Sequence, residues 1–127
     1  MNNLIAFVNT FLNGIFDRYD SNAFYIEADQ DQALPYGVFD SMSDSTNMNR
    51  SREDFTFTVT IYGTFEDMFK LDSISEDIKQ SILNGNIKQY CAPFTVAFDY
   101  LGRNDVPSQD PFIKVKEVRF RARYYNI

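Results

Sequence analysis

The chain has 127 residues, of which 44% are hydrophobic and 24% charged, and this is typical of one compact domain that buries its own apolar core. It has one cysteine and no histidine, which excludes an internal disulfide and a thiolate zinc cluster and removes the imidazole on which most acid–base and nucleophilic mechanisms depend. The net charge of −6 disfavours indiscriminate binding to duplex nucleic acid, so composition favours a structural or interaction protein over an enzyme.

The sequence gives no sign of a membrane or export segment. Every apolar stretch is interrupted by a polar residue well before it could span a bilayer. Residues 1–19 lack the basic start and the cleavage site of a signal peptide. With a single cysteine, this favours a soluble protein of a reducing compartment, with an N-terminus that belongs to the fold.

An amphipathic helix is predicted from Asn2 to Tyr19, because apolar side chains recur there at intervals of three and four residues. Phe7 lies off this stripe and is either exposed by chance or a contact for a neighbouring subunit. The stripe itself consists of Leu4, Ile5, Val8, Phe11, Leu12, Ile15, Phe16 and Tyr19.

Two short strands should follow, at Ala23–Ala28 and Leu34–Phe39, since both segments are rich in aromatic and β-branched residues. Ser41–Arg52 is polar and without periodicity, which predicts a long surface loop between strands. We expect this loop to be dispensable for folding and to order against a partner. Its candidate contact residues are Asp44, Asn47 and Asn49.

The middle of the chain predicts a strand and then a second helix. Apolar and polar residues alternate from Phe55 to Tyr62, as in a strand with one buried face. Thr64 and Asp67 have the spacing of a helix-capping pair, and an apolar stripe continues from Met68 to Leu83. Gly85 should end this helix.

Two more strands complete the chain. Alternation predicts a strand over Pro93–Leu101 that breaks at Gly102, with a second polar loop running to Pro111. In Phe112–Tyr125 the apolar residues change from odd to even positions near Lys116 and Glu117. A β-bulge in this last strand would explain the change.

The order helix, three strands, helix, two strands predicts an α+β fold in a single domain covering residues 1–127. We expect a mainly antiparallel sheet of four to five strands, with both helices packed on one face.

Candidate chemical groups are sparse. Two acidic groups could in principle hold a cation or perform acid–base chemistry, but neither has the pattern of a calcium loop or a hydrolase, and solvated charge is the simpler interpretation. Cys91 is expected to be a small buried side chain. We therefore predict no catalytic residue, cofactor or metal site. The two acidic groups are Glu27 with Asp29 and Asp31, and Asp72 with Glu76 and Asp77.

The last strand carries the most informative charges. Residues 112–127 contain five cations and a single carboxylate, Glu117. If Val118, Phe120, Ala122 and Tyr124 face the core, Arg119, Arg121 and Arg123 must line up on the opposite face of the strand. This arginine row could meet an acidic neighbouring subunit or nucleic acid, or it could be a solvated strand balanced by nearby acids.

Taken in order, these segments resemble the phage tail-completion proteins, also called tail terminators or tail-to-head joining proteins. The resemblance covers about 100 of the 127 residues and rests on the order and spacing of all the segments, because no single motif is specific. Many relatives have a tryptophan in or just after the central strand, where this chain has Ile61, Tyr62 and Gly63. The matching segments are the N-terminal helix, LPYGVF at Leu34–Phe39, the polar loop, FTFTVTIYG at Phe55–Gly63, the helix at Glu66–Leu83, LNG at Leu83–Gly85, the strand at Phe94–Leu101 and VRFRARYY at Val118–Tyr125.

The resemblance implies a non-enzymatic subunit of a ring, commonly a hexamer, which caps the tail tube and joins it to the head connector or neck protein. DNA would meet it only by passing through the ring lumen, and the protein would be assembled in the host cytoplasm and end in the virion. Another head-closure adaptor would share this assembly logic. A small ligand-binding or enzymatic α+β domain is the alternative from another class.

Overall fold

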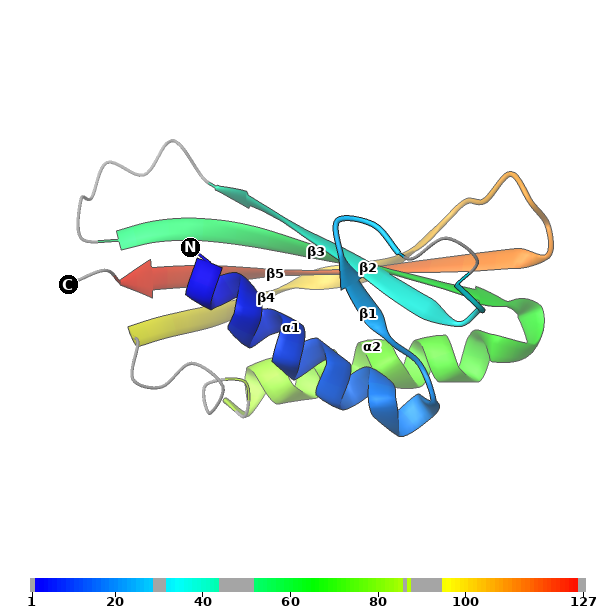
Figure 1. Cartoon of the computed structure of the whole chain (residues 1–127), viewed down its shortest axis with the longest axis horizontal. Coiled ribbons are helices and arrows are strands. Elements are labelled where there is room, and N and C mark those ends of the chain that lie inside the picture. Colours follow the sequence, from blue (N-terminus) through cyan, green and yellow to red (C-terminus); the bar gives the residue numbers. More distant parts are fainter. Residues whose placement is uncertain (1, 29–31, 44–51, 86, 88–94, 126–127) are drawn as a thin grey trace.

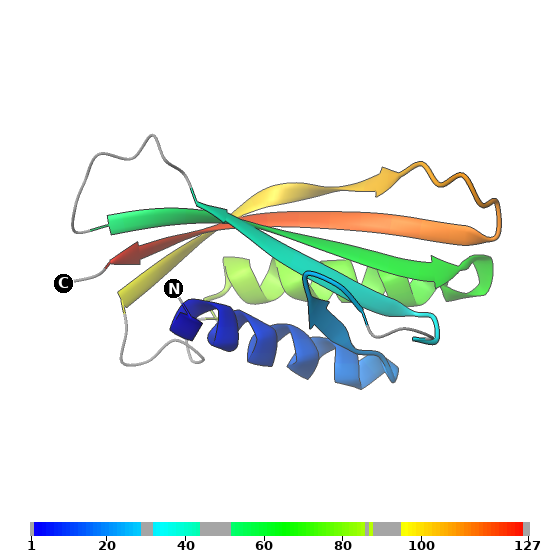
Figure 2. The ribbon, with the colours of Figure 1, turned by 45° about the horizontal axis from the view of Figure 1, so that its top comes forward.

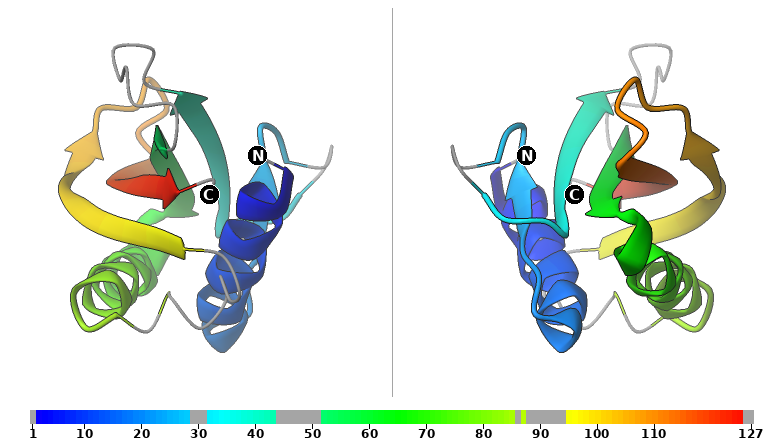
Figure 3. Two further views of the ribbon diagram at one scale, coloured as in Figure 1. Left: turned by 90° about the vertical axis from the view of Figure 1, so that its left-hand side faces the viewer. Right: turned by 90° about the vertical axis from the view of Figure 1, so that its right-hand side faces the viewer.

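The computed structural model describes residues 2–28, 32–43, 52–85, 87 and 95–125. Within them the chain forms one five-stranded sheet with the strand order β1-β2-β3-β5-β4, and two long helices lie on the same face of it (Figures 1 and 3). The elements are α1 (Asn2–Phe16), the 3-10 turn η1 (Asp17–Tyr19), β1 (Ala23–Tyr25), β2 (Tyr36–Ser43), β3 (Arg52–Thr64), the 3-10 turn η2 (Phe65–Asp67), α2 (Met68–Leu83), β4 (Thr95–Val106) and β5 (Ile113–Tyr125).

The predicted fold class is confirmed. Strand β1 runs parallel to β2, and the other three pairings are antiparallel, so the sheet is mixed but mainly antiparallel. The element order is the expected α-β-β-β-α-β-β. The long pairing of β3 with β5 joins segments about 60 residues apart and forms the centre of the sheet, as Figure 2 shows.

The core lies between the helices and the sheet. Most of both predicted helical stripes is buried there, with Phe16 and Ile78 fully inaccessible to solvent. Met68 and Leu83, at the two ends of the second stripe, are exposed instead. Phe7 is half-buried and packs against this core, so it is not exposed by chance. The largest fully buried side chains are Phe16, Phe39, Phe57, Phe120, Leu4, Leu12, Ile61, Ile74, Ile78, Ile87, Val8 and Val59.

Strand β1 is shorter than predicted. Ile26 has a φ of 72°, in the left-handed region that a β-branched residue rarely adopts, and this ends the strand after Tyr25. The outer edge of β1 is held by α1, because the Asn13 side chain accepts from the Ala23 N–H at 2.9 Å and donates to the Ala23 carbonyl at 3.1 Å. The helix thus satisfies a polar edge that could otherwise pair with another strand.

The first polar loop begins later than predicted. Ser41–Ser43 belong to β2, where they pair with Phe57, Thr56 and Phe55 of β3. The sequence did not predict this extension of β2, because its side chains are polar. Polar side chains are compatible with a strand at the edge of a sheet, where they can face solvent. Arg52, at the other end of the predicted loop, is the first residue of β3. Residues 44–51 lie outside the described residues.

The bulge lies in a different strand from the one predicted. Strand β5 pairs with β3 over its whole length without a register shift, whereas β4 shifts register against β5 between Tyr100 and Gly102. Gly102, with a φ of 144°, tolerates this geometry, and β4 continues to Val106 instead of ending there. The apparent phase change in β5 arises because Lys116 occupies a position facing the helices.

The second helix begins and ends as expected. Asp67 Oδ2 accepts from the Thr64 N–H at 2.9 Å and the Thr64 side chain accepts from the Asp67 backbone N–H, which together form a capping box on η2, directly before α2. At the other end Gly85 has a φ of 82°, and its N–H donates to the Ile82 carbonyl. No helix in the described part of the chain is both long and apolar enough to cross a membrane.

Candidate functional site

The face of the sheet opposite the helices carries the arginine row. None of the described helices or strands covers this face (Figures 2 and 3). Register and alternation place its side chains in rows across the strands, apolar at one end of the sheet and charged at the other. In order, the rows are Tyr36, Tyr62, Val115, Val106; then Val38, Thr60, Glu117, Asn104; then Asp40, Thr58, Arg119, Gly102; then Met42, Thr56, Arg121, Asp99; and finally Asp54, Arg123, Ala97.

Each member of the arginine row has a carboxylate partner within the chain. Arg119 pairs with Glu117, with 3.6 Å between Nε and Oε1. Arg123 contacts Asp99 of β4 twice, at 3.1 Å from Nε and 3.3 Å from Nη2, and Arg121 approaches the same carboxylate at 3.7 Å. The three arginine side chains are 36–51% exposed, so they remain partly reachable from solvent.

A buried aspartate adds a further negative charge beside the arginine row. Asp54 of β3 lies directly opposite Arg123 in the strand register and is only 5% exposed. Three carboxylates, those of Glu117, Asp99 and Asp54, therefore stand beside three arginines. A partner molecule that binds the arginine row must compete with these internal contacts.

The other sequence-predicted contact residues, Asp44, Asn47 and Asn49, lie outside the described residues, as does Cys91. Within the described part of the chain, the candidate set is represented by the three arginines, which share one face of β5.

The acidic group on α2 is fully partnered. Glu76 pairs with Arg103 of β4 at 2.7 Å, and Asp77 accepts from the Tyr19 hydroxyl at 2.7 Å. The hydrogen bond from Gln80, followed by the Arg103 charge, lowers the pKa of Glu76. The bond to Asp77, together with burial, raises the pKa of Tyr19. These contacts fasten α2 to its neighbours rather than forming an open site.

Asp72, the third acid of that group, pairs with Lys116. The Lys116 side chain is 15% exposed and also binds Asp105 of β4 at 3.1 Å, so it joins α2, β4 and β5. Burial alone would lower the pKa of Lys116, but hydrogen bonds to the two carboxylates outweigh it and raise that pKa above its ordinary value. Among the described residues, no group of three potential metal-ligating side chains is close enough to hold an ion.

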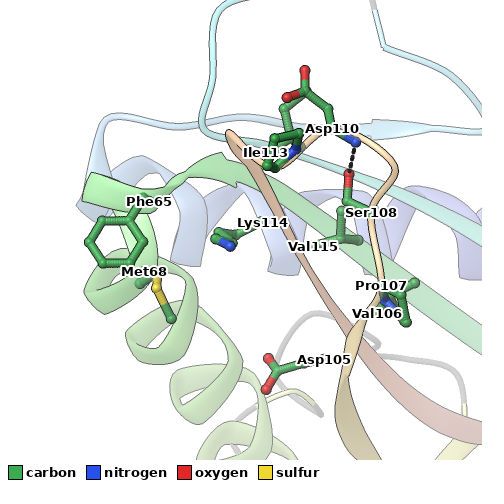
Figure 4. A pocket seen from close by; sticks show the side chains of 11 residues that line it. Phe65, Met68, Asp105, Val106, Pro107, Ser108, Asp110, Ile113, Lys114 and Val115 are labelled. Atoms are coloured by element: carbon green, nitrogen blue, oxygen red, sulfur yellow. Dashed lines mark hydrogen bonds between the residues drawn. The ribbon is translucent and has the colours of Figure 1, made fainter.

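Sequence reasoning missed a hollow at the end of the sheet. It has a volume of about 450 Å³ and lies between the start of α2 and the turn that joins β4 to β5 (Figure 4). Phe65 and Met68 form one side of it, and Val106, Pro107 and Val115 stand on the other. The missed signal was Phe65, an aromatic residue directly before the second helix and off its apolar stripe.

The polar groups of this hollow are engaged by the protein itself. Asp105 binds Lys116, and Asp110 accepts from the Phe112 N–H at 2.9 Å. The Lys114 amine lies 6.0 Å from the centre of the Phe65 ring, at the limit of a cation–π contact. The hollow is thus mainly an apolar surface with a charged rim.

Comparison with models of known protein families and with curated proteins finds no match to this chain.

Proposed function

We propose that the chain is a structural subunit of a phage virion, a tail terminator that forms a ring, caps the tail tube and joins it to the head connector. The observation that carries the proposal is a surface suited to assembly. Phe65, Phe69 and Phe112 are 69%, 87% and 78% exposed at one end of the molecule, whereas a monomeric protein rarely leaves such side chains together in water. The element order that the resemblance implies also agrees with the observed fold.

The chemistry of the described surface favours assembly over ligand turnover. A binding or catalytic pocket needs polar groups that converge on a ligand. In the hollow of Figure 4 both carboxylates are already used, because Asp105 binds Lys116 and Asp110 binds the backbone of Phe112. A surface of this kind supports a protein contact, and the proposal is accordingly for a protein without enzymatic activity or a cofactor.

The proposed partners follow from this role. Copies of the chain would form a ring, with six subunits as the expected number, between the tail tube protein and the connector or neck protein. DNA would pass through the lumen, and the ring would be assembled in the host cytoplasm and remain in the tail or neck of the virion. A head-closure adaptor, the closest alternative, would bind the connector but not the tail tube.

The test is to incubate the purified chain with isolated tail tubes and, separately, with connectors, and to examine both by light scattering and negative-stain microscopy. We expect rings with a central hole at tube ends. Binding to connectors alone would favour the head-closure adaptor. A chain that stays monomeric and binds neither structure would refute the proposal. A monomer that assembles only on the tube would support it.

A further inference from the structure

One end of the molecule presents a cluster of exposed apolar side chains that we call the aromatic end. Three of them are phenylalanines that expose most of their surface to solvent, and the fourth is a methionine that exposes 42%. The cluster consists of Phe65, Met68, Phe69 and Phe112. Three largely exposed phenylalanines amount to roughly 350–550 Å² of apolar surface, which is as large as the largest patch on a typical monomer.

A second surface, on α1 and the end of β1, has an unusual lack of charge. The 15 residues of α1 include no charged side chain, although the helix faces solvent at Ala6, Asn9 and Thr10. A helix on a protein surface ordinarily carries charges on its outer side, as α2 does with Lys70 and Asp72. Depletion of charge marks the centre of a protein interface.

The same surface is hollowed, and the residue that follows its β1 member in the sequence is an exposed isoleucine. A shallow depression of about 400 Å³ is lined by Ile5, Ala6, Asn9 and Tyr25. Ile26, the next residue, is 65% exposed and has a φ of 72°. Strained backbone conformations of this kind cluster at functional positions. We call this set the α1 surface: Ile5, Ala6, Asn9, Thr10, Tyr25 and Ile26.

The two surfaces lie apart within one chain. The first turns of α1 lie towards the end of the molecule that holds the N-terminus, whereas the start of α2 and the turn between β4 and β5 lie at the other end (Figures 1 and 2). They therefore cannot cover one another within a single chain.

We infer that the aromatic end of one copy packs on the α1 surface of a second copy. The inference rests on the proposed ring-forming function and specifies which surfaces form the ring. A contact between two different surfaces is heterologous: it leaves one free surface at each end and repeats until the rotation closes a ring. Phenylalanines that project from one copy would occupy the apolar depression of the next.

Charge favours this pairing over contact between two aromatic ends. Glu66, Lys70 and Asp110 are exposed charged residues close in sequence to the aromatic end. A symmetric contact would enclose these charges from both copies, whereas charged residues are depleted at the centre of an interface. The α1 surface itself includes no charged residue, and the exposed Glu27 follows Ile26 at its edge. An apolar centre of the size given above, with a polar rim around it, suits a standard interface of about 800 Å² per partner.

The test uses two variants of the full chain that each disable one surface. Phe69→Glu places a charge in the aromatic end, and Ala6→Glu places one in the α1 surface. Leu83→Glu is the matched control, because Leu83 is 60% exposed at the other end of the same helix as Phe69. Light scattering measures the mass of each protein over a concentration series, and circular dichroism checks that each remains folded. If Ala6→Glu fails to fold, Thr10→Glu, one turn further along the same face, replaces it.

We expect the parent chain and Leu83→Glu to assemble and each single-surface variant to remain monomeric. An equal mixture of Phe69→Glu and Ala6→Glu should form a dimer of two chains and nothing larger, because only one intact contact remains between them. Contradicting results would be variants that assemble like the parent, a mixture that stays monomeric, or a parent chain that is monomeric at about 1 mM.

The two proposals can fail separately. Normal capping of tail tubes by Phe69→Glu and Ala6→Glu would overturn the inferred contact and leave the terminator function in place. A mixture that forms the expected dimer, with a parent chain that never binds tubes, would support the contact and refute the terminator function.

Discussion

Replacement of Gly37 by alanine is expected to lower the free energy of unfolding, because α1 packs against the sheet at this residue. It lies in β2 opposite Ile61 of β3, and its N–H donates to the Asn22 carbonyl at 2.9 Å, so the backbone is held on both sides. A Cβ atom built on Gly37 would lie 2.5 Å from both Cε2 and Cζ of Phe16. The perturbation is Gly37→Ala, which adds this single atom.

The size of the effect follows from the distance. Carbon atoms in contact are ordinarily about 3.5–4.0 Å apart, so the Phe16 ring would have to move by about 1 Å. The ring is fully buried and lies in a closely packed core. Overpacking of this kind costs about 1–3 kcal/mol, and the absence of any free direction for the ring favours the upper value. We expect a loss of about 3 kcal/mol, or roughly 10 °C in melting temperature.

The assay is urea denaturation of a double-mutant cycle. Phe16→Leu shortens the side chain and should cost about 1 kcal/mol alone. In that background Gly37→Ala should cost less than about 1 kcal/mol, which gives a coupling energy of about 2 kcal/mol. As a control, Gly85→Ala should cost the same in both backgrounds, because its φ of 82° is strained for alanine but no atom lies within 4 Å of its Cβ position. Additive costs for Gly37→Ala and Phe16→Leu would refute the reasoning.

Two further predictions concern charged residues. Lys116→Met keeps the buried stem but loses the contacts to Asp72 and Asp105, which are 59% and 83% exposed, so we expect a loss of only about 1 kcal/mol in urea denaturation. Because the folded-state pKa of Lys116 is raised, its contribution to the free energy of unfolding is fully present below the unfolded-state pKa and is lost as pH rises through the folded-state pKa. If the difference in unfolding free energy between parent and variant persists unchanged at strongly alkaline pH, this reasoning is contradicted. Replacing the whole arginine row by glutamine should cost about 1–2 kcal/mol, mainly because Asp99 loses its partners, and should leave ring yield at low salt near that of the parent. A large loss of rings in a stable variant would instead make the row a contact between subunits.

Periodicity was sufficient to predict most of the fold. Burial against one core requires apolar residues at regular intervals along the chain. The helical stripes that contain Phe16 and Ile78 and the alternation in β3 have these intervals and could therefore be predicted. The phase of β5 was misinterpreted because Lys116 faces the helices with a buried stem and a charge that meets two carboxylates. The pattern of apolar and polar residues in a sequence does not distinguish such a lysine from an exposed one.

The candidate site was only partly predictable. The arginine row follows from alternation within one strand. Its partners do not, because Asp99 and Asp54 come from neighbouring strands whose register depends on the fold and on the bulge after Tyr100. The aromatic end is also a product of the fold, since Phe69 and Phe112 are 43 residues apart in the sequence and come together only at the end of the sheet.

The most direct test of the account is electron microscopy of tail tubes incubated with the parent chain, with Leu83→Glu and with Phe69→Glu. The account predicts a ring with a central hole at the tube ends for the parent chain and for Leu83→Glu, and bare tube ends for Phe69→Glu, because a heterologous ring needs the aromatic end of every copy. Bare tube ends with the parent chain would contradict the proposed function, and normal rings with Phe69→Glu would contradict the inferred contact.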